Sequence, residues 1–258
     1  MIDTSDKDKR YNMTSVAITI LLVLVTDTII TEGSTAIKNC CNVAVKDHYF
    51  TINKNSSGVY TIIDLCGQGT TVQGYCDTLT DGGGWLVIQR RKDGSEDFNR
   101  FWWEYEMGFG SLTGEFWYGL HAIHCLTSQG QWELRIDYIL PNGTNGYLSY
   151  SNFRVGPATE QYPLTISGYD GVTDDPFSTH SLNNMKFTTR DNDNDQWSRN
   201  CAAKYEDNGF KGGWWHSACS YIRPNHGYKN KYTILLNYRW HSLPFIEIKI
   251  RPKNCNNI

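Results

Sequence analysis

The chain has 258 residues, of which 40% are hydrophobic and 14% aromatic, enough for a packed core in one large domain or two ordinary ones. Its formal net charge is −3 and no basic run follows Lys7–Arg10, so the charge pattern gives no case for nucleic-acid binding. The seven histidines and the available Ser and Asp residues form no nucleophile elbow or HExxH motif. We therefore expect a protein that is not an enzyme.

The N-terminus has the order of a secretory signal. Lys7, Lys9 and Arg10 precede the apolar run Val16–Val25, and small residues follow at 33–36. The apolar run is about ten residues long, short of the roughly 20 that a membrane-spanning helix needs. We predict a signal peptide over residues 1–36, with an uncleaved signal anchor as the alternative, and a single domain over residues 37–258.

Secretion makes disulfide bonds the expected state of the cysteines. The chain has eight of them, at positions 40, 41, 66, 76, 125, 201, 219 and 255, and no paired C-x₂-C spacing typical of zinc sites. Two sequons, at Asn55 and Asn142, are predicted glycosylation sites in polar, turn-like stretches. We expect a secreted, disulfide-bonded glycoprotein.

Several apolar stretches are candidate strands, and two of them, Trp132–Tyr138 and Phe245–Ile250, alternate apolar and polar residues as a half-buried strand does. The candidate strands are Gly58–Ile63, Gly84–Gln89, Trp132–Tyr138 and Phe245–Ile250. A short helix is expected around Phe98–Glu106, and the Gly-rich stretch Asp81–Gly84 predicts a tight turn because glycine freely adopts positive φ. Between Pro141 and Cys219 the sequence predicts mostly ordered loop. Metal or disulfide bonds would have to stabilise such a region.

Hard oxygen ligands alternate directly before a cysteine in the segment Arg190–Cys201. Asp191, Asp193 and Asp195 lie two residues apart, so their carboxylates can converge, and the repulsion between them is relieved by a cation such as Ca²⁺. An EF-hand is excluded, because Gln196 stands at its glycine position and Ala202 at its bidentate glutamate position. A solvated Asp/Asn turn is the alternative.

Several ordered motifs together resemble the fibrinogen C-terminal domain family. They are Cys76–Phe98, Gly108–Gly110, Gly114–Gly119, Asp191–Asp195, Asn200–Ala202 and Gly213–Trp215. The resemblance covers residues 40–252 and is greatest to lectin-type members, the ficolins and tachylectins. It implies an α+β fold with a small disulfide-bonded N-terminal part, a central twisted antiparallel sheet and a loop-rich C-terminal part that holds calcium and the ligand.

The resemblance also implies a calcium site. In the family, two carboxylate ligands lie eight and six residues before the first cysteine of a small disulfide loop, which gives Asp193 and Asp195 here. Backbone carbonyls four and two residues before that cysteine, at Trp197 and Arg199, complete the protein ligands. Asp191 would assist them from outside the coordination sphere.

The implied ligand pocket is built around a Cys201–Cys219 disulfide. In lectin-type relatives the peptide before the second cysteine is cis, here Ala218–Cys219, and nearby backbone N–H groups hold an acetyl carbonyl. The residues implied to bind ligand are Tyr205, Cys219, Ser220, Tyr232, Thr233 and Tyr238. Phe210 competes with Tyr205, and Trp240 with Tyr238, because the spacing departs from that of the relatives.

The resemblance to ficolins suggests two N-terminal disulfides, Cys40–Cys66 and Cys41–Cys76. Since Cys40 and Cys41 are adjacent, the exchanged pairing stays open. Cys125 and Cys255 are unusual for the family, and the sequence leaves open whether they pair with each other or link chains.

Together these features imply a secreted, calcium-dependent lectin-like recognition protein. Its expected partners are acetylated glycans or other acetylated cell-surface glycoconjugates, with self-association into a homo-oligomer as a source of multivalency. The alternative is a protein-binding ligand or adhesive factor of the angiopoietin-like or matrix type, whose partners would be protein receptors.

Overall fold

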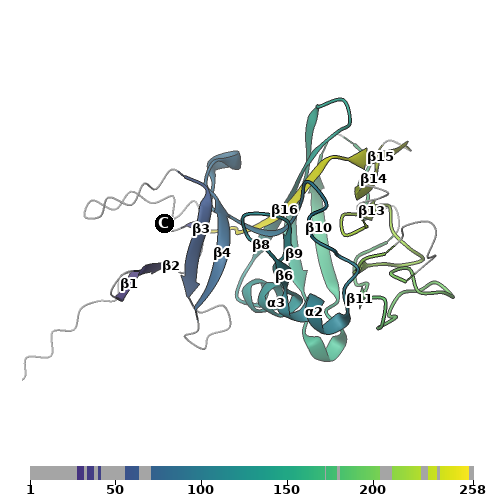
Figure 1. Ribbon diagram of the computed structural model, residues 1–258, viewed down its shortest axis with the longest axis horizontal. Coiled ribbons are helices and arrows are strands. Elements are labelled where there is room, and N and C mark those ends of the chain that lie inside the picture. Colours follow the sequence, from purple (N-terminus) through teal and green to yellow (C-terminus); the bar gives the residue numbers. More distant parts are fainter. Residues whose placement is uncertain are drawn as a thin grey trace, which may run out of the picture.

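A computed structural model describes residues 28–31, 34–37, 40–41, 56–63, 71–171, 173–178, 181–203, 211–227, 232–236 and 239–255. Within these ranges an 11-stranded sheet dominates, and two short helices lie at one end of it (Figure 1). This is the expected α+β fold. No helix in the described ranges has the length and apolar content needed to cross a bilayer.

The large sheet is antiparallel except where β2 runs parallel to β3. Its main path is, in spatial order, β1 (Thr28–Thr31), β2 (Ser34–Ile37), β3 (Gly58–Ile63), β4 (Thr71–Asp77), β5 (Trp85–Arg91), β16 (Phe245–Pro252), β8 (Trp132–Ile139), β9 (Asn145–Val155) and β10 (Leu164–Asp170). Two further strands, β6 (Phe109–Gly110) and β7 (Phe116–Trp117), join it because β7 also pairs with β5. β1 and most of β2 fall inside the stretch predicted as a signal peptide, which stays a prediction.

The remaining elements are short. The C-terminal part holds a two-stranded sheet of β11 (Phe187–Thr188) and β12 (Trp214–Trp215), and a three-stranded sheet of β13 (Ile222–Arg223), β14 (Tyr232–Leu236) and β15 (Arg239–Leu243). The helices are α2 (Trp102–Met107) and α3 (Leu120–Ser128), and the 3₁₀ turns are η1 (Thr80–Gly82) and η2 (Ala158–Glu160).

The four strands predicted from sequence are present as β3, β5, β8 and β16. Burial alternates along β8, where Leu134 and Ile136 face the core, as a strand covered on one face requires. The predicted helix is shorter than expected. It begins after Phe101, whose N–H donates to the Glu104 carboxylate at 2.8 Å, so residues 98–100 stay outside it.

The prediction of a mostly loop region between Pro141 and Cys219 is wrong in part, because β9 and β10 lie within it as strands of the central sheet. Gly, Ser and Asn have low strand propensity and hide the pattern of β9. Pairing with β8 on one side and β10 on the other overrides that preference. Helix α3 was also missed.

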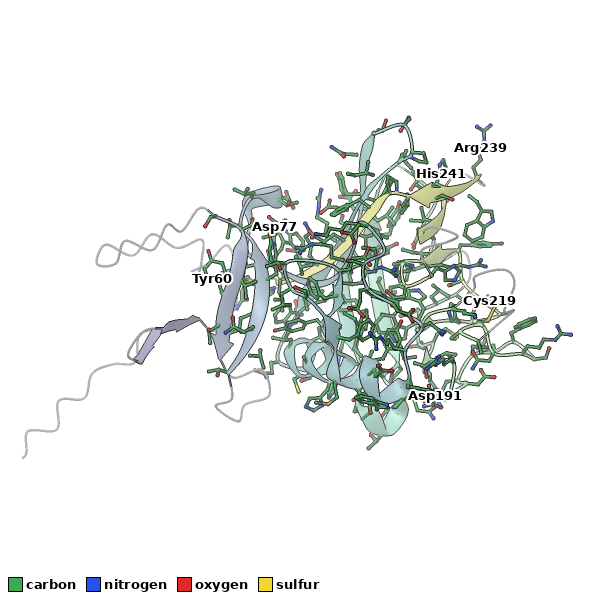
Figure 2. All side chains as sticks on the ribbon, in the orientation of Figure 1. Tyr60, Asp77, Asp191, Cys219, Arg239 and His241 are labelled. Atoms are coloured by element: carbon green, nitrogen blue, oxygen red, sulfur yellow. A yellow bond between two sulfur atoms is a disulfide. The ribbon has the colours of Figure 1, made fainter. Side chains whose placement is uncertain are left out.

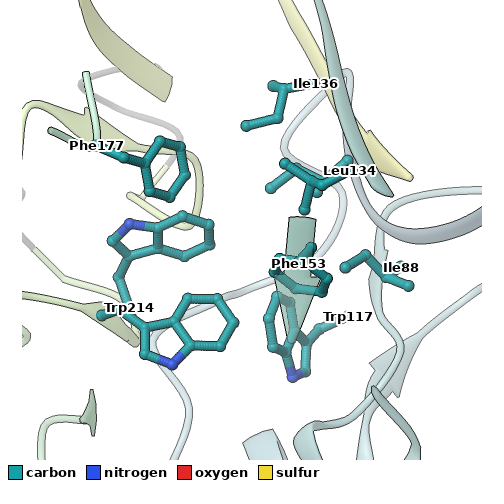
Figure 3. A pocket seen from close by; sticks show the side chains of 9 residues that line it. Ile88, Trp117, Leu134, Ile136, Phe153, Phe177 and Trp214 are labelled. Atoms are coloured by element: carbon teal, nitrogen blue, oxygen red, sulfur yellow. The ribbon is translucent and has the colours of Figure 1, made fainter. Parts of the chain in front are cut away.

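The core between the sheet and the C-terminal part is closely packed. Figure 3 shows Ile88, Leu134 and Ile136 of the sheet facing Phe177 and Trp214. The space left between these groups is about 10 Å³, less than one water molecule needs. The C-terminal part is therefore held against the sheet by apolar contact.

The N-terminal disulfides differ from the first predicted pairing, and the exchanged pairing is right for Cys40–Cys76 and wrong for Cys41. Cys40 bonds to Cys76 on β4, and Cys41 bonds to Cys255, with Cα–Cα distances of 5.3 and 5.4 Å. The reason is sheet order: β16 lies beside β5, so the chain end after β16 arrives at the turn before β5. There Gly84 has φ +77°, and a Cβ on it would collide with the Cys255 Sγ, so only glycine leaves room for this disulfide.

Cys125 is disulfide-bonded as well, and none of the described cysteines is free. Self-association through an unpaired Cys125 or Cys255 is therefore ruled out. Disulfides form and persist in oxidising compartments, so these bonds support an extracellular location.

Candidate calcium and ligand site

Polar side chains of β5 fasten the C-terminal part to the central sheet. The Gln89 Nε2 donates to the Asn225 Oδ1 at 3.0 Å and to the Pro224 carbonyl at 3.2 Å. Two residues further along the strand, the Arg91 Nη1 donates to the His226 carbonyl at 3.0 Å. Gln89, Arg91 and Asn225 are all buried, where unmade hydrogen bonds are costly. The segment Pro224–His226 after β13 is therefore fixed relative to the sheet.

The acidic loop before Cys201 is held by its own side chains. The Asn194 Nδ2 donates at 2.8 Å to a carbonyl in β11, and the Asn200 Nδ2 donates at 2.8 Å to the carbonyl that follows β11. The Asp191 Oδ1 accepts the first N–H of α2 at 2.9 Å. Asp191 thus joins the loop to the helix, and its predicted role beside a calcium ion stays a prediction.

Asp193 and Asp195 are the two carboxylates that remain for a cation. The Asp195 Oδ1 accepts the Trp197 N–H at 2.9 Å and its Oδ2 accepts the Cys201 N–H at 2.7 Å. Burial raises the pKa of Asp195 to about 6, with the Asp193 charge adding to the rise and the two N–H groups opposing it. The loop therefore brings two carboxylates together against their mutual repulsion.

The chemistry of these donors fits calcium. Two carboxylates and the backbone carbonyls of an irregular loop are hard oxygen ligands, which Ca²⁺ prefers. Across the described ranges, no three His, Cys, Asp or Glu side chains gather into a metal-binding group, so Asp191, Asp193 and Asp195 do not converge as a set of three and backbone carbonyls would have to complete the site. The carbonyls of Trp197 and Arg199 follow on the same loop, as the predicted ligand set requires.

We expect Ca²⁺ to raise the melting temperature, and the double change Asp193→Ala/Asp195→Ala to abolish that rise. A ligand that binds only the folded state stabilises it by about 2.7 kcal/mol at 100 times its Kd. Calorimetry in Ca²⁺ and in chelator measures the effect. The control is Asp174→Ala, which removes an exposed carboxylate from the same part of the chain and should keep the full calcium response. Equal melting temperatures with and without Ca²⁺ would contradict the site.

The Cys201–Cys219 disulfide is present as predicted and connects the acidic loop to the turn at Cys219. A second link joins the same two segments, because the Gln196 N–H donates to the Ser217 carbonyl at 2.9 Å. Figure 2 shows Asp191 and Cys219 at the same end of the molecule, far from Asp77. The geometry of the Cys219 turn therefore depends on the acidic loop.

The turn itself differs from the expectation. The Ala218–Cys219 peptide is trans, and the unusual backbone feature is instead the positive φ of Cys219, +67°. Few non-glycine residues adopt this region, and they do so where the surroundings hold them. Here the disulfide and the hydrogen bond from the Ser217 hydroxyl to the Cys219 carbonyl, at 3.2 Å, supply the restraint.

The predicted ligand-binding residues have different outcomes. Cys219 is half-exposed at the turn, but the Ser220 side chain is fully buried, where its hydroxyl donates to the Ile222 carbonyl and lies 3.0 Å from the His216 Nδ1. Ser220 therefore supports the turn from inside.

Tyr232 and Thr233 lie on β14, whose backbone is described without these side chains. Tyr205, Phe210 and Tyr238 lie outside the described residues, as do Cys66 and Asn55. Asn142 is exposed in the β8–β9 turn.

An aromatic pair that the sequence prediction only partly included joins Tyr221, two residues after Cys219, to Trp240. Trp240 on β15 is 48% exposed, and its ring meets that of Tyr221 edge to face at 5.8 Å. The Arg223 guanidinium lies 4.7 Å above the Trp240 ring. The pairing of β13 with β14 and of β14 with β15 places Arg223 and Trp240 on the same face. Tyr221 and Arg223 were missed because no local pattern marks them.

Comparison with known proteins identifies the fold. The family model described as fibrinogen beta and gamma chains, C-terminal globular domain, matches residues 38–253. The chain belongs to the fibrinogen C-terminal domain family. Chicken tenascin-R is 43% identical to this fibrinogen C-terminal domain over 209 residues, which are 78% of this chain and 15% of tenascin-R. Fibrinogen C domain-containing protein 1-B of Xenopus laevis is 40% identical over 218 residues, 79% of this chain and 46% of the relative.

Solved structures agree with this assignment. The fibrinogen-like globe domain of human ANGPTL6 has a TM-score of 0.71 at 33% identity and covers 83% of this chain and 95% of that domain. Lamprey fibrin D-dimer, solved with the peptide Gly-His-Arg-Pro-amide, has a TM-score of 0.68 at 30% identity, covering 83% of this chain and 73% of that one. This fibrinogen C-terminal domain thus spans less than half the length of the curated relatives named above. None of these relatives is named as a lectin, so the lectin-type assignment stays a prediction.

Proposed function

We propose that this fibrinogen C-terminal domain is an extracellular recognition module that binds acetylated glycans in a calcium-supported pocket at the Cys219 turn. The observation that carries the proposal is the double connection between the turn and the acidic loop, through the Cys201–Cys219 disulfide and the Gln196–Ser217 hydrogen bond. A cation held by Asp193 and Asp195 would stiffen the loop and, through these links, the turn.

The chemistry of the surface suits a small acetylated group. The half-exposed backbone at Cys219 can offer fixed polar groups, and the rings of Tyr221 and Trp240 offer an apolar face beside them. Small-ligand sites typically have a mostly apolar wall and a small number of polar groups that fix the orientation of the ligand. Such a shallow contact has few atoms with which to bind, so we expect each site to bind in the micromolar to millimolar range and to need multivalency for capture of a surface.

The test is a glycan array run with Ca²⁺ and with chelator, using free N-acetylglucosamine as competitor. We expect binding to acetylated glycans that chelator or competitor removes. Trp240→Ala should weaken it roughly tenfold by deleting the ring of an aromatic hot spot. The matched control is Trp103→Ala, which removes a tryptophan that is 63% exposed on α2 and should leave binding unchanged. Acetylated-glycan binding that survives both chelator and Trp240→Ala would contradict the proposal.

A protein-binding role is the second candidate. It is supported by the similarity to the lamprey fibrin domain, whose structure holds a peptide ligand, and by the ANGPTL6 domain at 33% identity. The same array distinguishes the two roles, because a protein-directed domain would show no glycan signal that N-acetylglucosamine removes.

A further inference from the structure

Two Asn-Gly pairs lie close together where β8 turns into β9. They are Asn142–Gly143 and Asn145–Gly146. An asparagine side chain that is followed by glycine can react with the glycine nitrogen, because glycine has no side chain to block the approach. The two pairs have the same local chemistry, so the fold decides which of them can react.

The first pair lies at the exposed tip of the turn. Asn142, Gly143 and Thr144 are all exposed, and a Cβ on Gly143 would meet nothing within 4 Å. The Gly143 N–H donates to the Leu140 carbonyl at 2.9 Å and so closes the turn. Exposed segments with few packed contacts open at little cost in free energy. The Gly143 nitrogen can therefore leave this hydrogen bond while the domain stays folded.

The Asn142 side chain is folded toward the peptide that would attack it. Its Oδ1 accepts the Thr144 N–H at 3.1 Å, and the ring that this bond closes contains the Gly143 nitrogen. The same N–H lies where negative charge develops on Oδ1 when a nucleophile adds to the side-chain carbonyl carbon. The turn thus restricts the amide to the neighbourhood of its nucleophile and supplies a donor for the oxyanion.

The second pair is held in the sheet. Asn145 pairs with Ile139, and Gly146 pairs with Tyr138, in the ladder between β8 and β9. A Cβ on Gly146 would collide with the Tyr138 ring, so this ring covers the backbone there. Ring closure at Asn145 needs a rotation of its backbone that an extended, paired strand does not allow. The strand would first have to leave its partner.

We propose that Asn142 is a site of spontaneous deamidation wherever it carries no glycan. The Gly143 nitrogen loses its proton and bonds to the Asn142 Cγ, the Cγ–Nδ2 bond breaks, and ammonia leaves with that proton. Water then opens the five-membered imide at either carbonyl, which leaves aspartate or isoaspartate and adds a negative charge to the turn. Glycosylation and deamidation exclude each other, because both use Nδ2. The modification does not depend on the function proposed above.

Asp93–Gly94 has the same arrangement with a carboxylate in place of the amide. The Ser95 N–H donates to the Asp93 Oδ1 at 3.0 Å, as the Thr144 N–H does to Asn142. Hydrogen bonds from the Ser95 hydroxyl and N–H lower the pKa of Asp93, so this side chain is ionised at neutral pH. An ionised carboxylate has no good leaving group for the reaction. Asp93 is therefore an internal negative control.

The experiment uses the full chain with Thr144→Ala, which removes the sequon and keeps the backbone N–H at residue 144. The protein is incubated in ¹⁸O water at physiological temperature and mildly alkaline pH. One sample is folded, and the other is reduced and unfolded in guanidinium chloride. Peptide mapping by mass spectrometry follows the conversion of amide to acid, with fragment ions that separate Asn142 from Asn145.

In the unfolded chain we expect the two asparagines to react at similar rates. Folding should slow Asn145 at least about tenfold relative to Asn142, because opening a paired strand costs more than opening an exposed turn. The variant Gly143→Ala should slow the reaction at Asn142 several-fold by crowding its nucleophile, and should leave Asn145 unchanged. Asp93 should stay unmodified over the same period.

Four results would overturn the proposal. The first two are no deamidation of Asn142 in the folded chain, and the same ratio of Asn142 to Asn145 rates in folded and unfolded protein. The third is an Asn142 rate that Gly143→Ala leaves unchanged, in a variant whose melting temperature shows that it is folded. The fourth is a reaction at Asp93 as fast as that at Asn142, since the side-chain amide would then not select the site.

Discussion

Lys249→Met should lower the free energy of unfolding by about 3–5 kcal/mol at pH 7, because it leaves buried carboxylates without their partner. The Lys249 Nζ lies 2.6 Å from Asp77, 2.8 Å from Glu247 and 2.9 Å from Asp137, on the face of β16 opposite its isoleucines. Only 3% of its side chain is exposed. Arg90 also binds Glu247, at 2.5 Å, and Arg135 binds Asp137, at 2.8 Å, so Asp77 is the carboxylate that loses its cation.

The stability difference between wild type and Lys249→Met should also depend on pH, in a direction that follows from the pKa of Asp77. Burial alone would raise the pKa of Asp77, but the hydrogen bond and charge of Lys249 outweigh it and hold that pKa well below its usual value. A depressed pKa contributes stability above the unfolded-state pKa, near 4, and the contribution is lost as the pH falls toward the folded-state value. Without Lys249, burial should instead raise the pKa of Asp77, so acidification would stabilise the variant. The stability difference between wild type and Lys249→Met should therefore shrink between pH 7 and pH 4.

Urea unfolding at several pH values measures this difference. The matched control is Lys253→Met, an exposed lysine just after β16, which should change stability by less than about 0.5 kcal/mol. A Lys249→Met variant as stable as this control at pH 7, or a difference that grows on acidification, would show that the ion cluster is not needed for stability.

Cys41→Ala/Cys255→Ala should cost about 5 kcal/mol under non-reducing conditions, by the chain-entropy account of disulfides. The bond joins residues that are 214 apart in sequence, so it restricts nearly the whole unfolded chain. Changing both cysteines avoids a free thiol at the Gly84 turn.

The internal comparison is Cys201→Ala/Cys219→Ala. That disulfide closes a separation of only 18 residues, for which the same account gives about 3 kcal/mol. We expect loss of Cys41–Cys255 to lower the free energy of unfolding more than loss of Cys201–Cys219 does. Loss of Cys201–Cys219 should weaken ligand binding more than loss of Cys41–Cys255 does. A smaller stability loss for the Cys41 and Cys255 variant would mean that the chain-entropy account does not describe this domain.

The sequence alone was sufficient for the features that depend on near neighbours. Short apolar stretches located β3 and β5, and alternation of apolar and polar residues located β8 and β16. The Gly-rich stretch before β5 was correctly predicted as a turn, with positive φ at Gly82, Gly83 and Gly84. The order of motifs was sufficient to identify the family and to predict the Cys201–Cys219 bond. The resemblance to the family nominated Asp193 and Asp195 for a cation, and this assignment stays a prediction.

Only the tertiary structure decided the rest, because these features join segments that are distant in sequence. The partner of Cys255 depends on β16 lying beside β5, and no local pattern encodes that neighbour. β9 becomes a strand through its pairing with β8 and β10 despite its Gly, Ser and Asn content. Tyr221 and Trp240 meet only because three short strands pair in one register. Strand pairing over long separations is a property of the whole packed chain, so it cannot be read from any one segment.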